Sequence, residues 1–427
     1  MRTSERHPPA VSAFTATSCL GAGVEAHRGA LRAGRSGLAP CRFMGLPFET
    51  WVGEVAGVDA ERLPPPLTDY DCRNNRLAWL GLQQDGFADA VRATVDRVGA
   101  ARMGVYLGTS TSGLLSTELA YRARDPATGA LPAWFRYAQT HNMASLASFV
   151  AQAFAIEGPR QVVSTACSSS AKAFGAAWRA LAAGLIDAAV VGGVDSLCLT
   201  TLYGFRSLEL LSREPCRPFD AERSGISIGE AAAFALLVRG EAADPGAPRL
   251  VGCGESSDAH HMSAPHPSGL GAERAMRAAL AMAGIAPAAV DYVNLHGTAT
   301  PSNDLAEDAA VRAVFGDAMP VSSTKGAHGH AMGGANALEA MVCLLALRER
   351  ALPPTLNLTE PAEGLAAEAI AAHNVPDGLA LQRAWKRRSI SSNSYGLISL
   401  TNGILRSSGG QTPAAKGAKA EFIGLTL

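Results

Sequence analysis

The strongest chemical signal in the sequence lies in the stretch QVVSTACSSSAKAF, which runs from Gln161 to Phe174. A β-branched run stops at one cysteine, Cys167, and small residues then begin a helical segment. Unpaired N–H groups and the positive end of the macrodipole at a helix start favour an anion, so we expect the Cys167 thiol to ionise readily. Small neighbours would let a substrate approach, as in other strand-to-helix nucleophile turns. Cys167 is therefore a candidate nucleophile, and a buried structural cysteine is the alternative.

A second stretch, VNLHGTATPSND, ends a strand-like run at His296. A glycine follows, and Thr298 and Thr300 then offer two hydroxyls before a helix that is expected to be capped near Ser302 or Asn303. A histidine after a strand is more often structural than catalytic. His296 is therefore a candidate catalytic residue only in combination with the other stretches.

A third stretch, SSTKGAHGHAMGGANALEAM, contains Lys325 and, five residues later, His330. Neutral imidazoles can donate hydrogen bonds to an enolate oxygen, so two strand-end histidines and a thiol indicate thioester or acyl chemistry. A metal site formed by His260, His261 and His266 in SSDAHHMSAPHP is disfavoured, because no spacing there is diagnostic of zinc or iron. We expect no bound metal.

Composition narrows the class of protein. The chain has 427 residues, of which 48% are hydrophobic and 18% charged, so it can bury a large core and is expected to be compact and oligomeric. A net charge of −1 provides no general attraction to nucleic acid or to an anionic membrane. The N-terminal residues lack the apolar segment of a signal peptide, and no long apolar run follows, so we expect a cytoplasmic protein. Eight scattered cysteines without a C-x-x-C pair argue against a zinc site and a disulfide framework.

Strand-like and helix-like segments alternate along the chain, which predicts an α/β fold with buried sheets. No tether-like linker interrupts residues 10–405, so the halves are expected to form one body. The expected strands are residues 103–108, 161–165, 188–192, 290–296, 320–324 and 388–392. The expected helices are residues 24–33, 168–183, 272–283, 303–314 and 335–350.

The stretches around Cys167 and Lys325 echo each other. Both run from a strand through Ser-Thr into a polar turn and then into a helix of small residues, which suggests one strand–turn–helix unit in each half, with both turns at a common site. The low complexity of residues 407–420 predicts a flexible tail over residues 407–427.

STACSSS, VNLHGTATPSND and STKGAHGHAMGGANALE together resemble the three motif blocks of the β-ketoacyl-acyl-carrier-protein synthases, the condensing enzymes of type II fatty-acid and polyketide synthesis. The resemblance runs from about Pro9 to Arg406 and includes CRPFDAERSGISIGEAAA and SSDAHHM. Each block is weak evidence by itself. The occurrence of all the blocks in the order and spacing of the family is strong evidence for the resemblance.

This resemblance implies the thiolase fold, in which two βαβαβαββ halves place their sheets around central helices in a five-layered αβαβα sandwich. Residues 1–245 would form the half with the nucleophilic cysteine, and residues 246–406 the half with the two histidines. It also implies a homodimer with one active site per subunit. No cofactor would be bound, because the phosphopantetheine arm arrives on an acyl carrier protein.

The resemblance implies a role for each residue that matches the family motifs. Cys167 would take the acyl group as a thioester. His296 and His330 would hold the carbonyl of malonyl-acyl carrier protein and stabilise the enolate left by decarboxylation. Lys325 would orient His330 and the nearby Glu339 rather than act as a base.

Five further residues match positions that bind substrate or carrier in the family. Thr298 and Thr300 would hydrogen-bond the pantetheine amides. Phe205 would line the channel, with ordinary core packing as the alternative. Arg73 and Arg76 would face the acidic carrier, and a solvated charge cluster is the competing interpretation.

The C-terminal motif departs from the family pattern N-S-F-G-F-G-G-T-N. Here the chain reads NSYGLISLTN over residues 393–402, so Leu397 replaces a phenylalanine, and Ile398 and Ser399 replace glycines. In the family this turn supplies an oxyanion-hole amide and a gate over the cysteine. Leu397 would contact substrate through a weaker gate, because a stiffer turn carries a smaller side chain. Two alignments of this stretch remain open.

The sequence thus predicts a decarboxylating condensing enzyme that forms β-ketoacyl-acyl carrier protein and CO₂ in fatty-acid elongation. A specialised ketosynthase of an aryl-polyene or polyketide pathway is the alternative within the same fold. A non-catalytic partner subunit such as a chain-length factor is disfavoured, because Cys167, His296 and His330 are all present. A degradative thiolase is disfavoured as well, because no second cysteine lies in residues 393–402.

Overall fold

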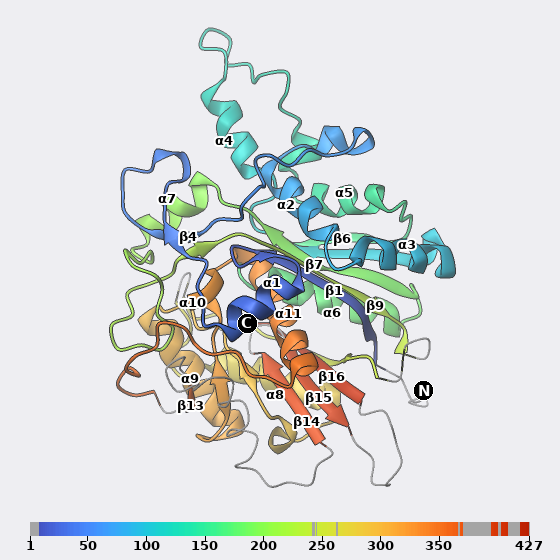
Figure 1. Ribbon diagram of the computed structural model, residues 1–427. Coiled ribbons are helices and arrows are strands. Elements are labelled where there is room, and N and C mark those ends of the chain that lie inside the picture. Colours follow the sequence, from blue (N-terminus) through green and yellow to red (C-terminus); the bar gives the residue numbers. More distant parts are fainter. Residues whose placement is uncertain are drawn as a thin grey trace.

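The structure is a computed structural model of the chain, and its architecture is a stack of five layers (Figure 1). Two central helices lie between two sets of strands, and further helices cover the outer faces of both sets. The described residues are 8–240, 244, 246–261 and 264–365, together with the backbone of four C-terminal strands at residues 368–369, 394–399, 403–408 and 419–426.

Five strands of the first half lie side by side in the order β6-β5-β7-β9-β1, and β1 pairs in turn with β10 of the second half at Ala10 and Arg249. Strands β5, β6 and β7 run parallel, and β9 runs antiparallel to both β7 and β1. Every residue of β9, with the sequence AAAFALLV, is buried, as expected for a strand covered on both faces. The bounds are β1 Ala10–Ser18, β5 Met103–Gly108, β6 Arg160–Val163, β7 Ala188–Asp195 and β9 Ala231–Val238.

The second half repeats this order with one strand added. Its strands follow the order β12-β11-β14-β15, and β16 then lies between β15 and β10. In the first half β9 pairs directly with β1. In the second half β16 lies between the corresponding strands and pairs with both β15 and β10. The bounds are β10 Arg249–Glu255, β11 Val293–Asn294, β12 Pro320–Ser322, β14 Ser394–Ser399, β15 Gly403–Ser408 and β16 Lys419–Thr426, with β13 Glu368–Ala369 beside β12.

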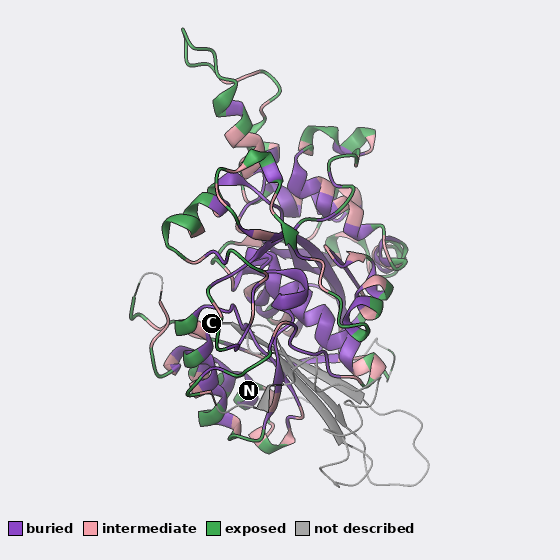
Figure 2. Cartoon of the chain, turned by 60° about the vertical axis from the view of Figure 1, so that its left-hand side comes forward, coloured by how far each residue is buried: buried purple, intermediate pink, exposed green. Residues whose placement is uncertain are grey.

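The central layer consists of α6, Ser169–Ala182, and α11, Ala335–Glu349, and both helices contact strands of both halves. Residues 335–346 of α11 are all buried, because its apolar residues surround the whole helix. Figure 2 shows this burial at the centre of the molecule. The helices over the first sheet are α2 Arg73–Leu82, α3 Phe87–Val98 and α5 Ser145–Ala153, and those over the second are α8 Leu270–Ala283 and α9 Pro301–Phe315.

Smaller elements surround one end of this stack. Helix α4 extends away from the body, next to α7, and a three-stranded sheet in the order β3-β4-β8 lies nearby (Figure 1). The bounds are α1 Val24–Arg32, α4 Leu114–Arg122, α7 Leu199–Ser207, α10 Lys325–His328, β2 Gly21–Ala22, β3 Ala39–Pro40, β4 Trp51–Gly53 and β8 Ile228–Gly229. Within the described ranges, no helix is long and apolar enough to span a membrane.

Most predicted elements and the two-fold repeat are confirmed, with two corrections. Helix α9 begins at Pro301 with Thr300 as its N-cap, because proline is favoured at the first helical position, where its missing N–H is not needed. The expected tail is wrong in part, because Lys419–Thr426 forms β16, which is hydrogen-bonded to β10 and β15. The expected strand at residues 388–392 lies outside the described residues.

Two glycines let α6 approach the first sheet closely. A Cβ added to Gly108, at the end of β5, would lie 2.2 Å from the backbone nitrogen of Ser170. A Cβ added to Gly193 in β7 would lie 2.7 Å from the Ser170 Cβ. The first turn of α6 therefore packs directly on the backbone of the sheet.

We expect Gly108→Ala to lower the free energy of unfolding by about 1–3 kcal/mol, because the added methyl group must displace backbone atoms of α6. Urea denaturation would measure the loss. Gly204→Ala on α7 is the matched control, since its added Cβ meets no atom within 4 Å. The control should be neutral or stabilised by up to about 1 kcal/mol, and equal losses in both variants would contradict the packing argument.

Candidate active site

Cys167 lies in a tight turn between β6 and α6. Ala166 has a positive φ of 53°, in a region that costs energy for an alanine. Hydrogen bonds hold this turn: the Ser169 hydroxyl donates to the Ala166 carbonyl at 2.5 Å, and the Thr165 N–H donates to the Ser169 hydroxyl at 2.9 Å. Ser168 is the N-cap of α6, and the Cys167 side chain remains half-buried. The structure therefore confirms the predicted strand-to-helix turn.

The expected ready ionisation of Cys167 is not supported. Burial raises the pKa of the thiol to about 11, although the nearby Lys325 charge lowers it. Helix α6 begins at Ser169, two residues after Cys167, and the burial of the Cys167 sulfur outweighs the effect of the helix start on its pKa. The resting side chain at neutral pH is a protonated thiol.

The three predicted motif blocks meet at this turn. His296 follows β11, and His330 lies between α10 and α11. Their rings are nearly perpendicular, at 83°, with centroids 5.1 Å apart. Cys167 Sγ and one nitrogen from each ring all lie within 4.8 Å of one another. A substrate carbonyl near the thiol would therefore be in reach of both imidazoles.

The partners of the other ring nitrogens determine where each imidazole carries its proton. The Met332 N–H donates to His330 Nδ1 at 2.9 Å, and Lys325 Nζ lies 3.1 Å from His296 Nδ1. Burial lowers the pKa of both histidines well below the usual range, and the Lys325 charge lowers it further. Both rings are thus neutral, with Nδ1 as the acceptor and the hydrogen on Nε2. Each histidine presents an N–H donor to the site.

The same pattern argues against a metal at these three residues, although their spacing would suit one. A metal-bound histidine needs a free lone pair on one nitrogen and usually donates its other N–H to an acceptor. Here His330 Nδ1 already faces an N–H donor, and His296 Nδ1 faces an ammonium group. The ring nitrogens therefore suit an oxygen that accepts two hydrogen bonds.

Lys325 contacts a different histidine from the one expected. Its ammonium group forms a buried ion pair with Glu339 and approaches His296, not His330. The Nδ1 atom of His330 is already occupied by the Met332 N–H, so it has no acceptor left for Lys325. The predicted link between Lys325 and Glu339 is present, and the link to His330 is corrected to His296.

The other candidate substrate contacts differ in how they are placed. Thr298 and Thr300 are buried beside His296, with their hydroxyls 2.9 Å apart. Phe205 on α7 is half-buried and packs against an apolar cluster that includes Met332. Leu397 belongs to β14, and its side chain lies outside the described residues.

Arg73 is not placed to meet a carrier protein, and it is not a solvated charge either. Its side chain is 4% exposed and pairs with Glu230 at 2.7 Å and Asp59 at 2.6 Å. Glu230 is fully buried and also accepts the N–H of Val55. Arg73 therefore neutralises a buried carboxylate. Arg76 is more exposed and pairs with Asp71.

Two buried carboxylates that position the site were not singled out from the sequence. Glu307 on α9 accepts the N–H groups of His296 and Gly297, at 2.6 and 2.7 Å. Burial raises its pKa to about 8, although both hydrogen bonds lower it. The only sequence signal was an acidic residue near the end of the second turn of the helix that follows His296.

Asp195, at the end of β7, is the second such carboxylate. It accepts N–H groups from Ser110 and Thr111 after β5 and from Gly334 before α11, at 2.7 to 3.1 Å. It therefore ties the first sheet to the segment that follows His330. No local pattern in GGVDSL marks this role.

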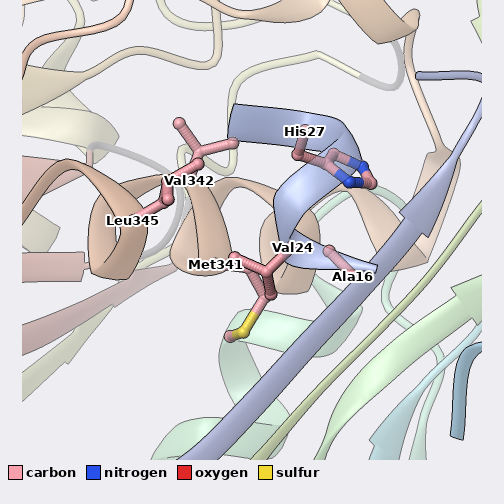
Figure 3. A pocket seen from close by; sticks show the side chains of 6 residues that line it. All are labelled: Ala16, Val24, His27, Met341, Val342 and Leu345. Atoms are coloured by element: carbon pink, nitrogen blue, oxygen red, sulfur yellow. The ribbon is translucent and has the colours of Figure 1, made fainter. Parts of the chain in front are cut away.

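A small pocket lies away from these residues, between α1, β1 and α11 (Figure 3). His27 is its polar member, and both ring nitrogens of His27 have partners, the Ser18 hydroxyl and the Gly23 carbonyl. The pocket is otherwise apolar and touches neither Cys167 nor the two site histidines. Its lining residues are Ala16, Val24, His27, Met341, Val342 and Leu345.

Comparison with known proteins agrees with this site. The N-terminal domain of the β-ketoacyl synthases matches residues 77–243, and the C-terminal domain of that family matches residues 248–359. A 3-oxoacyl-(acyl-carrier-protein) synthase 2 of Coxiella burnetii is 32% identical over 94% of this chain and 98% of its own length. The chain therefore belongs to the β-ketoacyl synthase family.

Two further similar proteins carry names other than 3-oxoacyl-(acyl-carrier-protein) synthase. Nodulation protein E of Rhizobium meliloti is 39% identical, over 61% of this chain and 66% of its own length. A structure of a ketosynthase in complex with its chain length factor from Xenorhabdus doucetiae is similar, with a TM-score of 0.77 and 37% identity over 87% of this chain and 92% of the matched chain. The fold is thus the thiolase fold of the ketosynthases.

We expect Arg73→Met to lower the free energy of unfolding by about 3–5 kcal/mol, because Glu230 would remain buried without its cation. Arg76→Met, at the more exposed pair with Asp71, should cost about 1 kcal/mol or less. Urea denaturation of both variants would measure the difference. Equal stability of the two variants would show that Arg73 has no such structural role.

We also expect alkylation of Cys167 by iodoacetamide to rise about tenfold per pH unit without reaching a plateau at the ordinary thiol pKa, since the pKa is raised to about 11. Below its pKa a thiol reacts in proportion to its thiolate fraction, which increases as the pH rises. Peptide mass spectrometry would follow the label, with Cys167→Ala as the control for the other cysteines. A plateau near pH of about 8.5 would contradict the raised pKa.

Proposed function

We propose that the protein catalyses a decarboxylative Claisen condensation between an acyl thioester and malonyl-acyl carrier protein. The observation that carries this proposal is one thiol surrounded by two neutral imidazoles, each with its Nε2 hydrogen directed away from a filled Nδ1. A thiol provides covalent storage of an acyl group, and two N–H donors provide a site for an enolate oxygen. The family membership supports the same chemistry.

In the first half-reaction, Cys167 Sγ attacks the carbonyl carbon of the acyl thioester. A new C–S bond forms to Cys167, and the bond to the pantetheine sulfur breaks. The thiol of Cys167 is protonated at the start, so its proton must pass to the leaving thiolate. The products are acyl-Cys167 and a carrier with a free thiol, and no other reactant is needed.

In the second half-reaction, the malonyl thioester carbonyl accepts hydrogen bonds from His296 and His330. The C–C bond to the carboxylate breaks, CO₂ leaves, and the electron pair moves into an enolate. Neutral imidazoles suit this step, because cationic rings would also stabilise the malonyl carboxylate and thus the ground state. The enolate carbon attacks the acyl-Cys167 carbonyl, a C–C bond forms and the C–S bond to Cys167 breaks. The β-ketoacyl product stays on the carrier, and the Cys167 thiolate takes up a proton from water.

The surrounding residues receive supporting roles in this proposal. Lys325, paired with Glu339, holds His296 in the tautomer that donates from Nε2. The Thr298 and Thr300 hydroxyls are placed to hydrogen-bond the pantetheine amides beside His296. Arg76 is the remaining basic candidate for contact with an acidic carrier protein, and Phe205 is the candidate for the acyl channel.

A homodimer is part of the proposal. Strand β6 is at the edge of the first sheet, and its residues Arg160 and Gln161 are exposed, as is Thr165 of the turn before Cys167. Free strand edges are normally covered in native proteins. Exposed large apolar side chains near α4 offer additional area for a second copy; these are Leu119, Tyr121, Trp134 and Tyr137.

A second candidate function is that of a specialised ketosynthase that works with a chain length factor. It is supported by the 37% identity to a chain from the ketosynthase and chain length factor complex, over 87% of this chain and 92% of the matched chain. In that case the partner at β6 would be a related chain rather than a second copy. Fatty-acid elongation remains our first proposal, because the synthase of Coxiella burnetii matches nearly its whole length.

We expect His296→Ala and His330→Ala to reduce decarboxylation of malonyl-acyl carrier protein by about a hundredfold or more, since each variant loses an N–H donor to the enolate. Acyl loading of Cys167 should fall much less, because the thiol is intact. Carbon dioxide release measures decarboxylation, and intact-mass spectrometry measures the acyl-enzyme.

Cys167→Ala is the matched control for the division of labour. It should form no acyl-enzyme but keep measurable decarboxylation, because both imidazoles remain. Persistent acylation of Cys167→Ala would reject the nucleophile, and equal loss of loading and decarboxylation in the histidine variants would reject their assignment.

A further inference from the structure

A third histidine of the Lys325 stretch, His328, has no part in the chemistry described above. It is the last residue of α10, it is fully buried, and it lies two residues before His330. Burying an imidazole is costly unless both ring nitrogens find partners. The partners of this ring therefore indicate what it contributes.

The His328 ring is bonded at both nitrogens, and only one tautomer fits. His328 Nδ1 lies 2.8 Å from the Gly329 carbonyl, and Nε2 lies 2.8 Å from the Thr324 hydroxyl. A carbonyl can only accept, so Nδ1 carries the hydrogen and Nε2 accepts from Thr324. This tautomer is the opposite of the one at His296 and His330.

The two partners of His328 stand at the two ends of the turn that carries the reacting groups. Thr324 is the N-cap of α10 and directly precedes Lys325. Gly329 has a positive φ of 76° and directly precedes His330. The ring therefore connects the start of the turn to its end and holds Lys325 and His330 at a defined separation.

The outer side of the turn is clamped by backbone. The His330 N–H donates to the Ser227 carbonyl at 2.7 Å, and the Gly229 N–H donates to the His330 carbonyl at 2.9 Å. The His328 carbonyl is so close to β4 and β8 that a Cβ added to Gly53 or Gly229 would lie 2.6 or 2.3 Å from it. Backbone hydrogen bonds within α10 also join the two ends, from the His328 N–H to the Thr324 carbonyl and from the Gly329 N–H to the Lys325 carbonyl. The His328 ring adds a side-chain link from the Thr324 hydroxyl to the Gly329 carbonyl.

The environment keeps the ring neutral. Burial and the Lys325 charge lower the pKa of His328 to about 3, although the hydrogen bond to the Gly329 carbonyl raises it. His27, on α1, is itself buried and bonded to Ser18 and Gly23. The Cys19 thiol faces the His328 carbonyl rather than its ring.

We propose that His328 is a positioning residue of the condensing reaction, acting through its hydrogen bonds to Thr324 and Gly329. The ring holds the turn so that Lys325 reaches His296 and His330 presents Nε2 toward the thiol. His328 contacts no reacting atom. The inference rests on the proposed function, because the step it supports is malonyl decarboxylation.

Thr324→Val tests the hydrogen bond without removing the buried ring, because valine keeps the volume of threonine and lacks the hydroxyl. We expect kcat for malonyl decarboxylation to fall about tenfold, as for loss of one positioning hydrogen bond, with KM nearly unchanged and acyl loading of Cys167 reduced less than decarboxylation. Thr324→Ser keeps the hydroxyl and should recover most of the activity. Lower stability with an unchanged kcat would overturn the proposal, as would an equal loss of loading and decarboxylation.

A second variant tests the same hydrogen bond in case Thr324→Val does not fold. His328→Asn can keep an N–H donor toward Gly329 but loses the Nε2 acceptor, so it should show the same selective loss of kcat. Thermal denaturation would show that the compared variants are folded. If His328→Asn folds and decarboxylates as well as wild type, the proposal is wrong.

A readout without substrate separates this inference from the proposed function. The Lys325 charge lowers the pKa of Cys167, so a turn that lets Lys325 move away should slow iodoacetamide alkylation of Cys167 severalfold at a fixed pH. Wild-type protein that fails to decarboxylate malonyl-acyl carrier protein would reject the proposed function alone. Unchanged alkylation in both Thr324→Val and His328→Asn would reject the positioning role.

Discussion

The site depends on one constraint, that a hydrogen-bond donor occupies Nδ1 of each reacting histidine. The Met332 N–H fills this position at His330, and the Lys325 ammonium group fills it at His296. Both Nε2 hydrogens then point to the remaining space near Cys167, and the same donors make the pair unsuitable for a metal. A proton on the wrong nitrogen would turn a donor into an acceptor and leave an enolate oxygen without support.

The fold meets this constraint by bringing two copies of one supersecondary unit together. Each half carries a strand, a polar turn and a central helix, and the two helices, α6 and α11, start side by side, where the Ala337 N–H donates to the Ser170 hydroxyl at 2.9 Å. Asp195 adds hydrogen bonds from the first half to Gly334. The thiol from one half and the imidazoles from the other are thus held by the same central layer.

Sequence reasoning located the reacting residues but not the contacts that set their state. Cys167 and His296 each follow a strand, and His330 follows the short helix α10 after β12; all three lie in motifs of the family order, so their meeting was predictable. The contact of Lys325 with His296 rather than with His330 was not predictable, because it depends on the Met332 backbone N–H, which donates to His330 Nδ1. Arg73 resembles a surface charge in DCRNNR, and only its pairing with Glu230, 157 residues away, places it in the interior. The pKa of Cys167 likewise reflects burial that no local pattern encodes.

The position of α4 and α7 has a consequence for how this protein could diversify. The central layer tolerates little change, because glycines such as Gly108 and Gly193 bring backbones into direct contact beneath Cys167. Helix α4, by contrast, extends away from the body beside α7, and most of its side chains are not fully buried (Figures 1 and 2). Substitutions on α4 can therefore accumulate without disturbing the backbone contacts of the central layer. Tolerance to substitution and preservation of the reacting geometry therefore belong to different parts of the chain.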